Sequence, residues 1–322
     1  MKTAIVLYTQ SCSLSRQTRE LNRLLNQLKT SIFEVELWLF YQDKKPDIFP
    51  DISCALSCIK LVRVENPHLP ESFLFLLEQI YKKEAIDLLL FTSDSLGEEL
   101  ATRLAYRLNG SSCLQVENCK PSMASLEVTR PAYGNNLTAQ FNLKVSPYCL
   151  SVAGLTGDPV KSIQQKGPII ELKGLKQLKP NWVKELSITL DQPDNGLADA
   201  DIVLAVGQGV KNRETVEILK QIAASLGAKL AASRPVVMKG WVEMKCLVGS
   251  SGLILTPKLC IAAGVSGAGA FSLGIKNSEF IIAINTDSKA PVFKIADVGI
   301  VDDQLEVLRH LERVINTKKE LD

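Results

Sequence analysis

Two glycine-rich turns in the C-terminal half of the chain have the composition of phosphate-binding loops. Gly207-Gln208-Gly209 follows one strand-like run, and GVSGAGA, residues 264–270, follows another. Small residues let the backbone approach a phosphate closely, and free amide groups at the start of a helix bind anions. The first turn lacks the third glycine and the later acid of the dinucleotide fingerprint. Close packing of a helix on a sheet would explain either turn as well, so they predict a site for a phosphorylated ligand only together with other signals.

A cation beside hydroxyl groups lies between these two turns in the sequence. Ser233 and Arg234 precede the glycine-rich run VGSSG, residues 248–252. A guanidinium group held beside hydroxyls suits an anionic or electron-rich ligand. The alternative is a surface turn whose arginine is simply solvated.

The histidine count excludes a His-rich metal site and a catalytic centre built on several histidines. The chain has 322 residues but only two histidines, His68 and His310, and neither lies in the motifs above. The sequence contains no Ser/His/acid set, no paired carboxylates within a motif and no P-loop. A binding site without acid–base groups is typical of a protein that carries a reactive cofactor, whose chemistry belongs to the cofactor.

The eight cysteines are expected to be small buried core residues. Cys54 and Cys58 are four residues apart, which is not a C-x-x-C spacing. The first apolar run is too short for a signal peptide, and no stretch approaches the roughly 18 apolar residues of a spanning helix. We therefore expect a cytoplasmic protein without disulfide bonds and without stable membrane insertion.

The overall charge gives no case for a nucleic-acid partner. Lys and Arg total 37, Asp and Glu total 35, and the formal net charge is +2. Aromatic residues make up 6% of the chain, which also argues against base-stacking surfaces.

Alternating strand and helix patterns predict the elements that position these motifs. In the N-terminal half they alternate at residues 4–9, 21–28, 33–41, 60–64, 71–83, 87–92 and 96–108. Such alternation predicts a parallel sheet with helices on both faces. Two further strand-like runs, 125–133 and 137–144, flank Gly134-Asn135-Asn136 and predict a hairpin added antiparallel to that sheet.

The alternation restarts in the C-terminal half. Strand and helix patterns follow at residues 201–206, 212–227, 229–232, 259–263, 280–284 and 305–315. Between the halves, periodicity fades over residues 154–186. We therefore predict two α/β domains, 1–190 and 191–322, the second of them doubly wound.

Long motifs resemble those of the electron-transfer flavoprotein alpha subunit (FixB-like) family. PKLCIAAGVSGAGAFSLGIKNSEFIIAINTDSKAPVFKIADVGIVDD, residues 257–303, and the segment 207–252 resemble its FAD-binding domain. TRPAYGNNLTAQF, residues 129–141, is similar to a hairpin of the same family. The resemblance implies an N-terminal domain of the adenine-nucleotide alpha-hydrolase-like fold and a C-terminal, Rossmann-like FAD-binding domain.

The resemblance also implies an electron carrier rather than a substrate-converting enzyme. The alpha subunit binds one FAD and forms a heterodimer with an electron-transfer flavoprotein beta subunit, which the N-terminal domain supports. Electrons arrive from a flavin dehydrogenase, commonly of the acyl-CoA type, and leave to a downstream acceptor. Two alternatives stay open: an NAD-dependent dehydrogenase built on the Gly207–Gly209 turn, and a cofactor-free structural partner.

Matching the family motifs assigns roles around the FAD. Arg234 would lie near the isoalloxazine ring, the Ser251 hydroxyl near the flavin edge, residues 266–268 at the pyrophosphate and Asp303 on the adenosine side. The full set of implied cofactor-binding residues is Ser233, Arg234, Gly249, Ser251, Gly264, Ser266, Gly267, Ala268, Gly269, Ala270, Phe271, Asn285 and Asp303.

Three positions depart from the family pattern. Gln208 stands where the family has an arginine, and Ala270-Phe271 stand where it has Gln-His. That histidine donates a hydrogen bond to the flavin O2 and supports the anionic semiquinone, whereas phenylalanine donates nothing. A charge-assisted hydrogen bond contributes about 1.5–3 kcal/mol, which is about 65–130 mV for one electron. We therefore expect FAD binding with a less stabilised anionic semiquinone.

Overall fold

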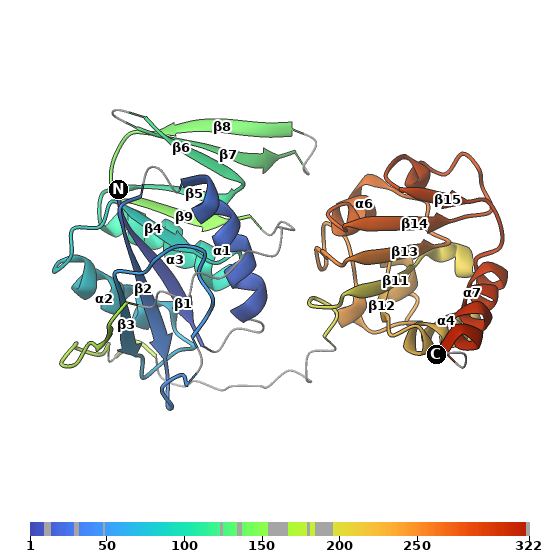
Figure 1. Cartoon of the computed structure of the whole chain (residues 1–322), viewed down its shortest axis with the longest axis horizontal. Coiled ribbons are helices and arrows are strands. Elements are labelled where there is room, and N and C mark those ends of the chain that lie inside the picture. The colour runs from blue at the N-terminus through green and yellow to red at the C-terminus, as the bar shows by residue number, and fades with distance from the viewer. Residues whose placement is uncertain are drawn as a thin grey trace. The chain divides into compact units, whose positions relative to one another are not determined.

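In the computed structural model the chain forms two compact units, Met1–Ile188 and Thr189–Asp322 (Figure 1). The structure describes residues 1–9, 14–28, 32–47, 49–122, 125–133, 137–153, 167–178, 181–183 and 196–319. Both units are α/β folds built on a parallel sheet, as the alternating sequence pattern predicts.

A seven-stranded parallel sheet forms the centre of the N-terminal unit. In sheet order its strands are β10 (Ile169–Glu171), β3 (Cys58–Arg63), β2 (Glu34–Tyr41), β1 (Lys2–Tyr8), β4 (Leu88–Phe91), β9 (Tyr148–Val152) and β5 (Ser111–Val116). Alternate residues of β1 enter two separate cores, as the period of a strand requires. Ile5 and Leu7 pack with helix α1 (Leu14–Leu28), whereas Ala4 and Val6 pack with α2 (Pro70–Tyr81) and α3 (Ser95–Arg107).

The predicted hairpin exists, but its place in the fold was predicted wrongly. Strands β7 (Leu126–Ala132) and β8 (Leu137–Leu143) pair antiparallel, with β6 (Asn118–Pro121) on the other side of β7, in a separate three-stranded sheet. Leu126 and Val128 are fully buried in the core that α1 also enters. The hairpin therefore packs on a face of the parallel sheet, while β5 takes the edge position. The turn residues 134–136 lie outside the described residues.

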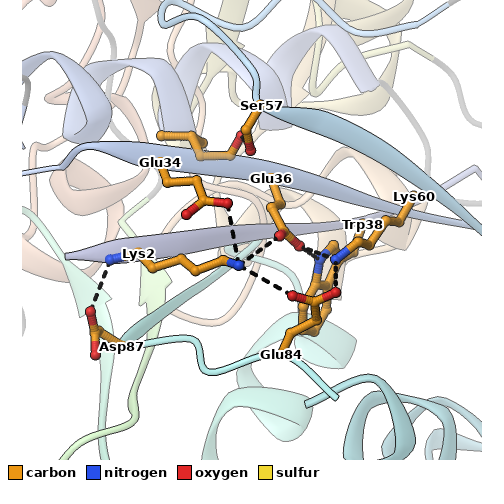
Figure 2. A network of polar contacts seen from close by, with 9 residues as sticks. Lys2, Glu34, Glu36, Trp38, Ser57, Lys60, Glu84 and Asp87 are labelled. Atoms are coloured by element: carbon orange, nitrogen blue, oxygen red, sulfur yellow. Dashed lines mark hydrogen bonds and ion pairs between the residues drawn. The ribbon is translucent and has the colours of Figure 1, made fainter. Parts of the chain in front are cut away.

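A network of charged groups joins the amino ends of four neighbouring strands of the parallel sheet (Figure 2). Lys60 Nζ lies 2.6 Å from Glu36 Oε2 and 2.8 Å from Glu84 Oε1. Lys2 Nζ lies 3.2 Å from a carboxylate oxygen of each of the same two glutamates. Trp38 Nε1 also donates to Glu36, at 2.7 Å. Glu36 and Lys60 are only 2% and 5% exposed, so each charge relies on its partners for the stabilisation that water would otherwise give.

The C-terminal unit has a five-stranded parallel sheet. Its strands, in sheet order, are β12 (Lys229–Ala232), β11 (Ile202–Val206), β13 (Leu259–Ala263), β14 (Phe280–Ile284) and β15 (Val298–Ile300). Its helices are η1 (Gln208–Val210), α4 (Arg213–Ser225), α5 (Arg234–Met238), η2 (Met244–Cys246), α6 (Gly269–Ile275), η3 (Pro291–Lys294) and α7 (Gln304–Lys319). Helices α4 and α7 contribute to the core on one face, and α6 to the core on the other. The sheet is therefore doubly wound, as predicted.

Local signals in the sequence account for the helix ends. Asn212 Oδ1 accepts a hydrogen bond of 2.8 Å from the Thr215 amide and caps α4. Gly227 follows that helix with φ of +69°, and Asn109 follows α3 with φ of +53°. These left-handed residues end helices because glycine and asparagine tolerate positive φ.

Five of the seven cysteines in the described residues are buried. Burial raises the pKa of the Cys119, Cys149 and Cys260 thiols to about 12, so these groups stay protonated and unreactive at neutral pH. Cys12 lies outside the described residues. Among the described helices, none is long and apolar enough to cross a bilayer.

Candidate functional site

A cavity of about 430 Å³ opens at the carboxyl ends of the C-terminal sheet. Strands β11, β12, β13 and β14 end one residue before Gly207, Ser233, Gly264 and Asn285, and all four residues line the cavity. Strands β11 and β13 are neighbours in the middle of the sheet. The chain continues from β11 to β12 on one side and from β13 to β14 on the other side, so the direction of the connections reverses between β11 and β13. The cavity therefore occupies the topological switch point, where open α/β sheets bind ligands.

Most of the residues implied by the family motifs come together in this cavity. Those that line it are Ser233, Arg234, Gly249, Ser251, Gly264, Ser266, Ala268, Ala270, Phe271 and Asn285. Gly267 and Gly269 belong to the same turn without lining the cavity, and Asp303 lies at the start of α7, also outside the lining.

The two glycine-rich turns are interlocked. The Gly209 amide donates a hydrogen bond of 2.9 Å to the Gly264 carbonyl, and the Gly207 amide donates one of 2.9 Å to Ala263. A Cβ atom on Gly207 would overlap the Gly264 carbonyl, and one on Gly209 would lie 2.8 Å from it. Gly264 itself has φ of +63°. Tight packing between the turns thus requires these glycines, in agreement with the alternative that the turns serve close packing. The same glycines line the cavity without side chains, so their backbone is accessible to a ligand.

Ser233 is the clearest sign that the cavity receives a ligand. It precedes helix α5, is 7% exposed, and its Oγ atom has no hydrogen-bond partner in the described residues. A buried hydroxyl without a partner is unfavourable and rare. Arg234, directly after it, is exposed and lines the same cavity. A ligand with acceptor groups would satisfy both side chains.

Two further glycines lie close to other backbone segments, Gly249 in the cavity lining and Gly267 in the turn beside it. Gly249 has φ of +127°, and a Cβ atom there would lie 2.5 Å from the Ala270 carbonyl. Gly267 has φ of +81°, and a Cβ atom there would overlap the Val292 amide. Positive φ at both positions disfavours residues with a side chain.

Asn285 lines the cavity and links two of the backbone segments around it. Its Nδ2 donates to the Val265 carbonyl at 2.7 Å, and its Oδ1 accepts from the Asp287 amide at 2.9 Å. Asp287 is exposed and lines the cavity, although the sequence analysis did not select it. Its position three residues after the end of β14 was the available signal, because the carboxyl ends of parallel strands meet at one edge.

Phe271 lies at the boundary between the cavity and the apolar core. It is 8% exposed and packs in the same core as Ile275 and Val292. The ring lines the cavity but offers no hydrogen-bond donor. His68 and His310 are both exposed and do not line it.

These observations fit an FAD group. The site supplies glycine-lined backbone, an unpartnered serine hydroxyl, an exposed arginine and an apolar ring, which suit a pyrophosphate and an aromatic ring system. Within the described residues no group of His, Cys, Asp and Glu is arranged to hold a metal ion. Asp287 is the one carboxylate among the lining residues, so no paired carboxylates face a ligand.

Comparison with known proteins agrees with this fit. Residues 196–276 match the family model of the electron transfer flavoprotein FAD-binding domain, and residues 55–174 match that of the electron transfer flavoprotein domain. Protein FixB of Rhizobium meliloti is 34% identical over 80% of this chain and 75% of its own length. YgcQ of Escherichia coli K12, whose name assigns it provisionally to the electron transfer flavoprotein subunits, is 36% identical over 76% of this chain and 84% of its own length.

A third relative is the LctC subunit of the lactate dehydrogenase (NAD(+),ferredoxin) of Acetobacterium woodii. It is 30% identical over 76% of this chain, and the match spans 59% of the relative. The fold and the cavity define an FAD-binding flavoprotein. The chain belongs to the electron transfer flavoprotein alpha subunit family, which includes the FixB proteins.

Proposed function

We propose that this protein is the alpha subunit of a heterodimeric electron carrier that takes electrons from a dehydrogenase and delivers them to a downstream acceptor. The observation that carries the proposal is the cavity at the switch point, which gathers ten of the thirteen implied cofactor residues around an unpartnered Ser233 hydroxyl. Bound FAD supplies the electron-accepting chemistry. The protein supplies binding, orientation and electrostatics.

Separate parts of the cavity take separate parts of the cofactor in this proposal. Ser233, Arg234 and Ser251 hold the flavin ring, and the arginine places positive charge beside it. The turn 264–270 holds the pyrophosphate. Asn285 and Asp303 serve the adenosine side, with Asp303 acting from beyond the cavity lining. Phe271 excludes water from the flavin side of the cavity.

The N-terminal domain, residues 1–190, is proposed to support the beta subunit with which alpha subunits of this family normally pair. The C-terminal domain, residues 191–322, is proposed to carry the FAD. The five buried cysteines of the described residues are free thiols, which suits a reducing compartment, and we place the protein in the cytoplasm.

Two dehydrogenase classes are the first electron donors to test. The family resemblance favours an acyl-CoA dehydrogenase. The similarity to LctC, a subunit of a lactate dehydrogenase, favours a 2-hydroxy acid dehydrogenase as the second candidate.

Co-expression with a beta-type subunit tests the proposal. We expect a yellow heterodimer with one FAD bound to this chain, whose flavin absorbance is bleached by a donor dehydrogenase and its substrate. The matched pair Arg234→Ala and Arg309→Ala separates the site from general effects, because Arg309 is exposed on α7. Only Arg234→Ala should weaken flavin binding. A colourless complex would support a cofactor-free structural partner, and a bound nicotinamide would support the dehydrogenase alternative.

A further inference from the structure

The segment 167–178 runs along one edge of the N-terminal sheet, and we name it the strap. It contains β10, which is the edge strand of the sheet and pairs with β3. The Leu172 amide continues this pairing with a hydrogen bond of 3.0 Å to the Leu61 carbonyl. Beyond β10, Leu172 and Leu175 pack against the core that α2 and α3 share. The strap is therefore held both at the sheet edge and against a helical face.

Two glutamines fix the far end of the strap. Gln79 of α2 donates to the Lys176 carbonyl and accepts from the Lys176 amide, both at 2.9 Å. Gln177 of the strap donates to the Arg63 carbonyl at 2.9 Å and accepts from the Glu65 amide at 3.3 Å. Each side-chain amide thus bonds the backbone of another segment through both of its polar atoms.

A cavity of about 260 Å³ lies between the strap, strand β3 and the turn after α2. It belongs to the N-terminal unit and shares no lining residue with the cofactor cavity. At about 30 Å³ for each water molecule, its volume holds about nine non-hydrogen atoms. The cavity therefore has the size of a small metabolite and is smaller than a nucleotide.

Both signs of charge line this cavity. Its charged residues are Lys60, Lys83, Glu84, Glu171 and Lys173. The strap and the turn after α2 each contribute one acid and one lysine, and the remaining lysine lies on β3. The C-terminal end of a helix such as α2 also carries partial negative charge. Such a lining suits a ligand that bears both a carboxylate and an ammonium group.

The lysines of the lining have hydrogen-bond donors left for a ligand. Lys60 is 5% exposed, and its ammonium group lies 2.6 Å from Glu36 and 2.8 Å from Glu84 (Figure 2). An ammonium group has three donors, so the third makes no hydrogen bond to a described residue. Lys83 is exposed, and no described acid lies within ion-pair distance of it. A ligand carboxylate would accept hydrogen bonds from both lysines.

The two acids of the lining keep their charge and part of their acceptor capacity. Hydrogen bonds from Lys60 to Glu84 and from Lys45 to Glu171 hold the pKa of each carboxyl below its ordinary value. Glu171 accepts from Tyr41 at 3.0 Å and from Lys45 at 2.9 Å. Since a carboxylate offers about four acceptor positions, both acids retain positions for a ligand ammonium group.

The remaining lining residues, Ile80, Leu172 and Leu175, are aliphatic. Ile80 is buried, and the two leucines are partly buried against the same core. An aliphatic group beside them removes apolar surface from water. An inorganic anion would leave this surface unused, and a simple carboxylic acid would leave both glutamates without a ligand partner.

We propose that the cavity beneath the strap binds a small zwitterionic amino acid with an aliphatic side chain, of about the size of leucine. Lys60 and Lys83 donate to its carboxylate. Glu84 and Glu171 accept from its ammonium group. The aliphatic side chain contacts the three apolar residues of the lining. The bound amino acid thereby links the strap to the end of α2 and holds the strap in place.

Calorimetric titration of the full-length chain with leucine tests the site. 4-Methylpentanoate lacks the ammonium group and 3-methylbutylamine lacks the carboxylate. We expect each to bind about tenfold more weakly than leucine or worse, because charge-assisted hydrogen bonds are lost. Absence of leucine binding would overturn the site. Binding of 4-methylpentanoate as tight as that of leucine would overturn the assignment of a zwitterion.

Two neighbouring lysines provide a matched pair of variants. Lys83→Gln removes a charge from the lining, whereas Lys82→Gln removes one from an exposed residue outside it. Lys83→Gln should weaken leucine binding about tenfold, and Lys82→Gln should leave it unchanged. Equal affinities of the two variants would overturn the placement of the ligand beside Lys83.

Hydrogen exchange locates the bound amino acid in the full-length chain. Saturating leucine should slow the exchange of amides in the strap and at the end of α2, because opening of the strap then requires loss of the ligand. Exchange in α4 of the other unit should stay unchanged. Slower exchange confined to the C-terminal unit, or no change in the strap, would overturn the assignment.

Discussion

Gln304 Nε2 donates a hydrogen bond of 2.9 Å to the carbonyl oxygen of Gly209. Gln304 is the first residue of α7 and is 4% exposed, so the final helix holds the turn that follows β11. The Gly209 amide in turn donates to Gly264 in the second glycine-rich turn. Helix α7 and both turns therefore form one connected support beneath the cofactor cavity.

Removing that amide should weaken the support. In Gln304→Ala the Gly209 carbonyl loses its buried partner, so we expect the free energy of unfolding to fall by about 1–3 kcal/mol. FAD affinity should fall as well, because the turn that lines the cavity is no longer held. Urea denaturation of the flavin-free protein and flavin fluorescence titration measure the two effects.

Arg309→Ala is the matched control on the same helix, since this side chain is exposed. It should change neither quantity. Equal stability of Gln304→Ala and the unaltered protein would show that the hydrogen bond does not support the turn.

Two neighbouring glycines should respond oppositely to alanine. Gly267→Ala forces a side chain into a conformation with φ of +81° and against the Val292 backbone. We expect a loss of about 1–3 kcal/mol in stability, together with weaker FAD binding. Gly269 begins α6, and a Cβ atom there would meet no atom within 4 Å. Gly269→Ala should raise stability by about 0.4–1 kcal/mol, because alanine loses less entropy on folding.

Thermal unfolding of both variants with and without FAD checks this pair. Similar melting temperatures for Gly267→Ala and Gly269→Ala would contradict the geometry of the turn.

Removing the unpartnered hydroxyl of Ser233 should affect the flavin-free protein and its FAD complex in opposite directions. Without FAD, Ser233→Ala should leave stability unchanged or raise it, because a buried unsatisfied group is removed. With FAD, the same change should raise the dissociation constant about 3- to 10-fold, since one hydrogen bond to the ligand is lost. Calorimetric titration with FAD and melting of the flavin-free protein measure both effects.

Ser72 provides the control, because its hydroxyl is also buried without a partner but lies on α2 in the N-terminal unit. Ser72→Ala should behave like Ser233→Ala in the absence of FAD and leave the FAD dissociation constant unchanged. A Ser233→Ala protein that binds FAD as tightly as the original would show that the hydroxyl faces no ligand atom.

The period of the apolar residues was enough to predict both parallel sheets and most of their helices. Strand β1, for example, sends Ile5 and Ala4 into different cores, and the sequence shows this as a continuous apolar run. The position of the hairpin could not be predicted in this way. Leu126 and Val128 show that one face of β7 is buried, but not whether the hairpin lies at an edge or on a face of the parallel sheet.

The sequence was enough to predict those cavity residues that directly follow a strand. Gly207, Ser233, Gly264 and Asn285 directly follow strands, so their meeting at one sheet edge follows from the alternation of elements. Gln304 was not predictable, because nothing in a glutamine at the start of a helix indicates that its amide is buried against a turn 95 residues away.

The charged network at the amino ends of the strands should make stability depend on acid pH. Hydrogen bonds from Lys60 and Lys2 hold the pKa of the Glu84 carboxyl below its ordinary value. A carboxyl whose pKa is lowered by folding contributes stability above its unfolded pKa of about 4.3, and this contribution is lost as pH falls through the lower folded value. Glu84→Gln should therefore flatten the fall in stability below about pH 5, as measured by urea denaturation across pH.

Lys60→Met tests the buried centre of the same network (Figure 2). It removes the ammonium group 2.6 Å from Glu36, which is 2% exposed. We expect a loss of about 3–5 kcal/mol, because the carboxylate is left buried with fewer partners. Lys44→Met, which removes an exposed pair with Asp47, should cost far less stability, because water already solvates both of its charges. Equal losses would contradict the burial of the network.

Because Phe271 replaces the histidine of the family pattern, we expect the one-electron reduction potential of the bound flavin to differ from that of the family. Its ring lines the cavity and has no hydrogen-bond donor. In Phe271→His, an imidazole that donates to the reduced, negatively charged flavin should raise the one-electron reduction potential by about 65–130 mV. Phe271→Leu is the control, since it also lacks a donor and should leave the potential unchanged. Titration against dyes of known potential measures the shift, and equal potentials for the histidine and leucine variants would show that residue 271 does not contact the flavin ring.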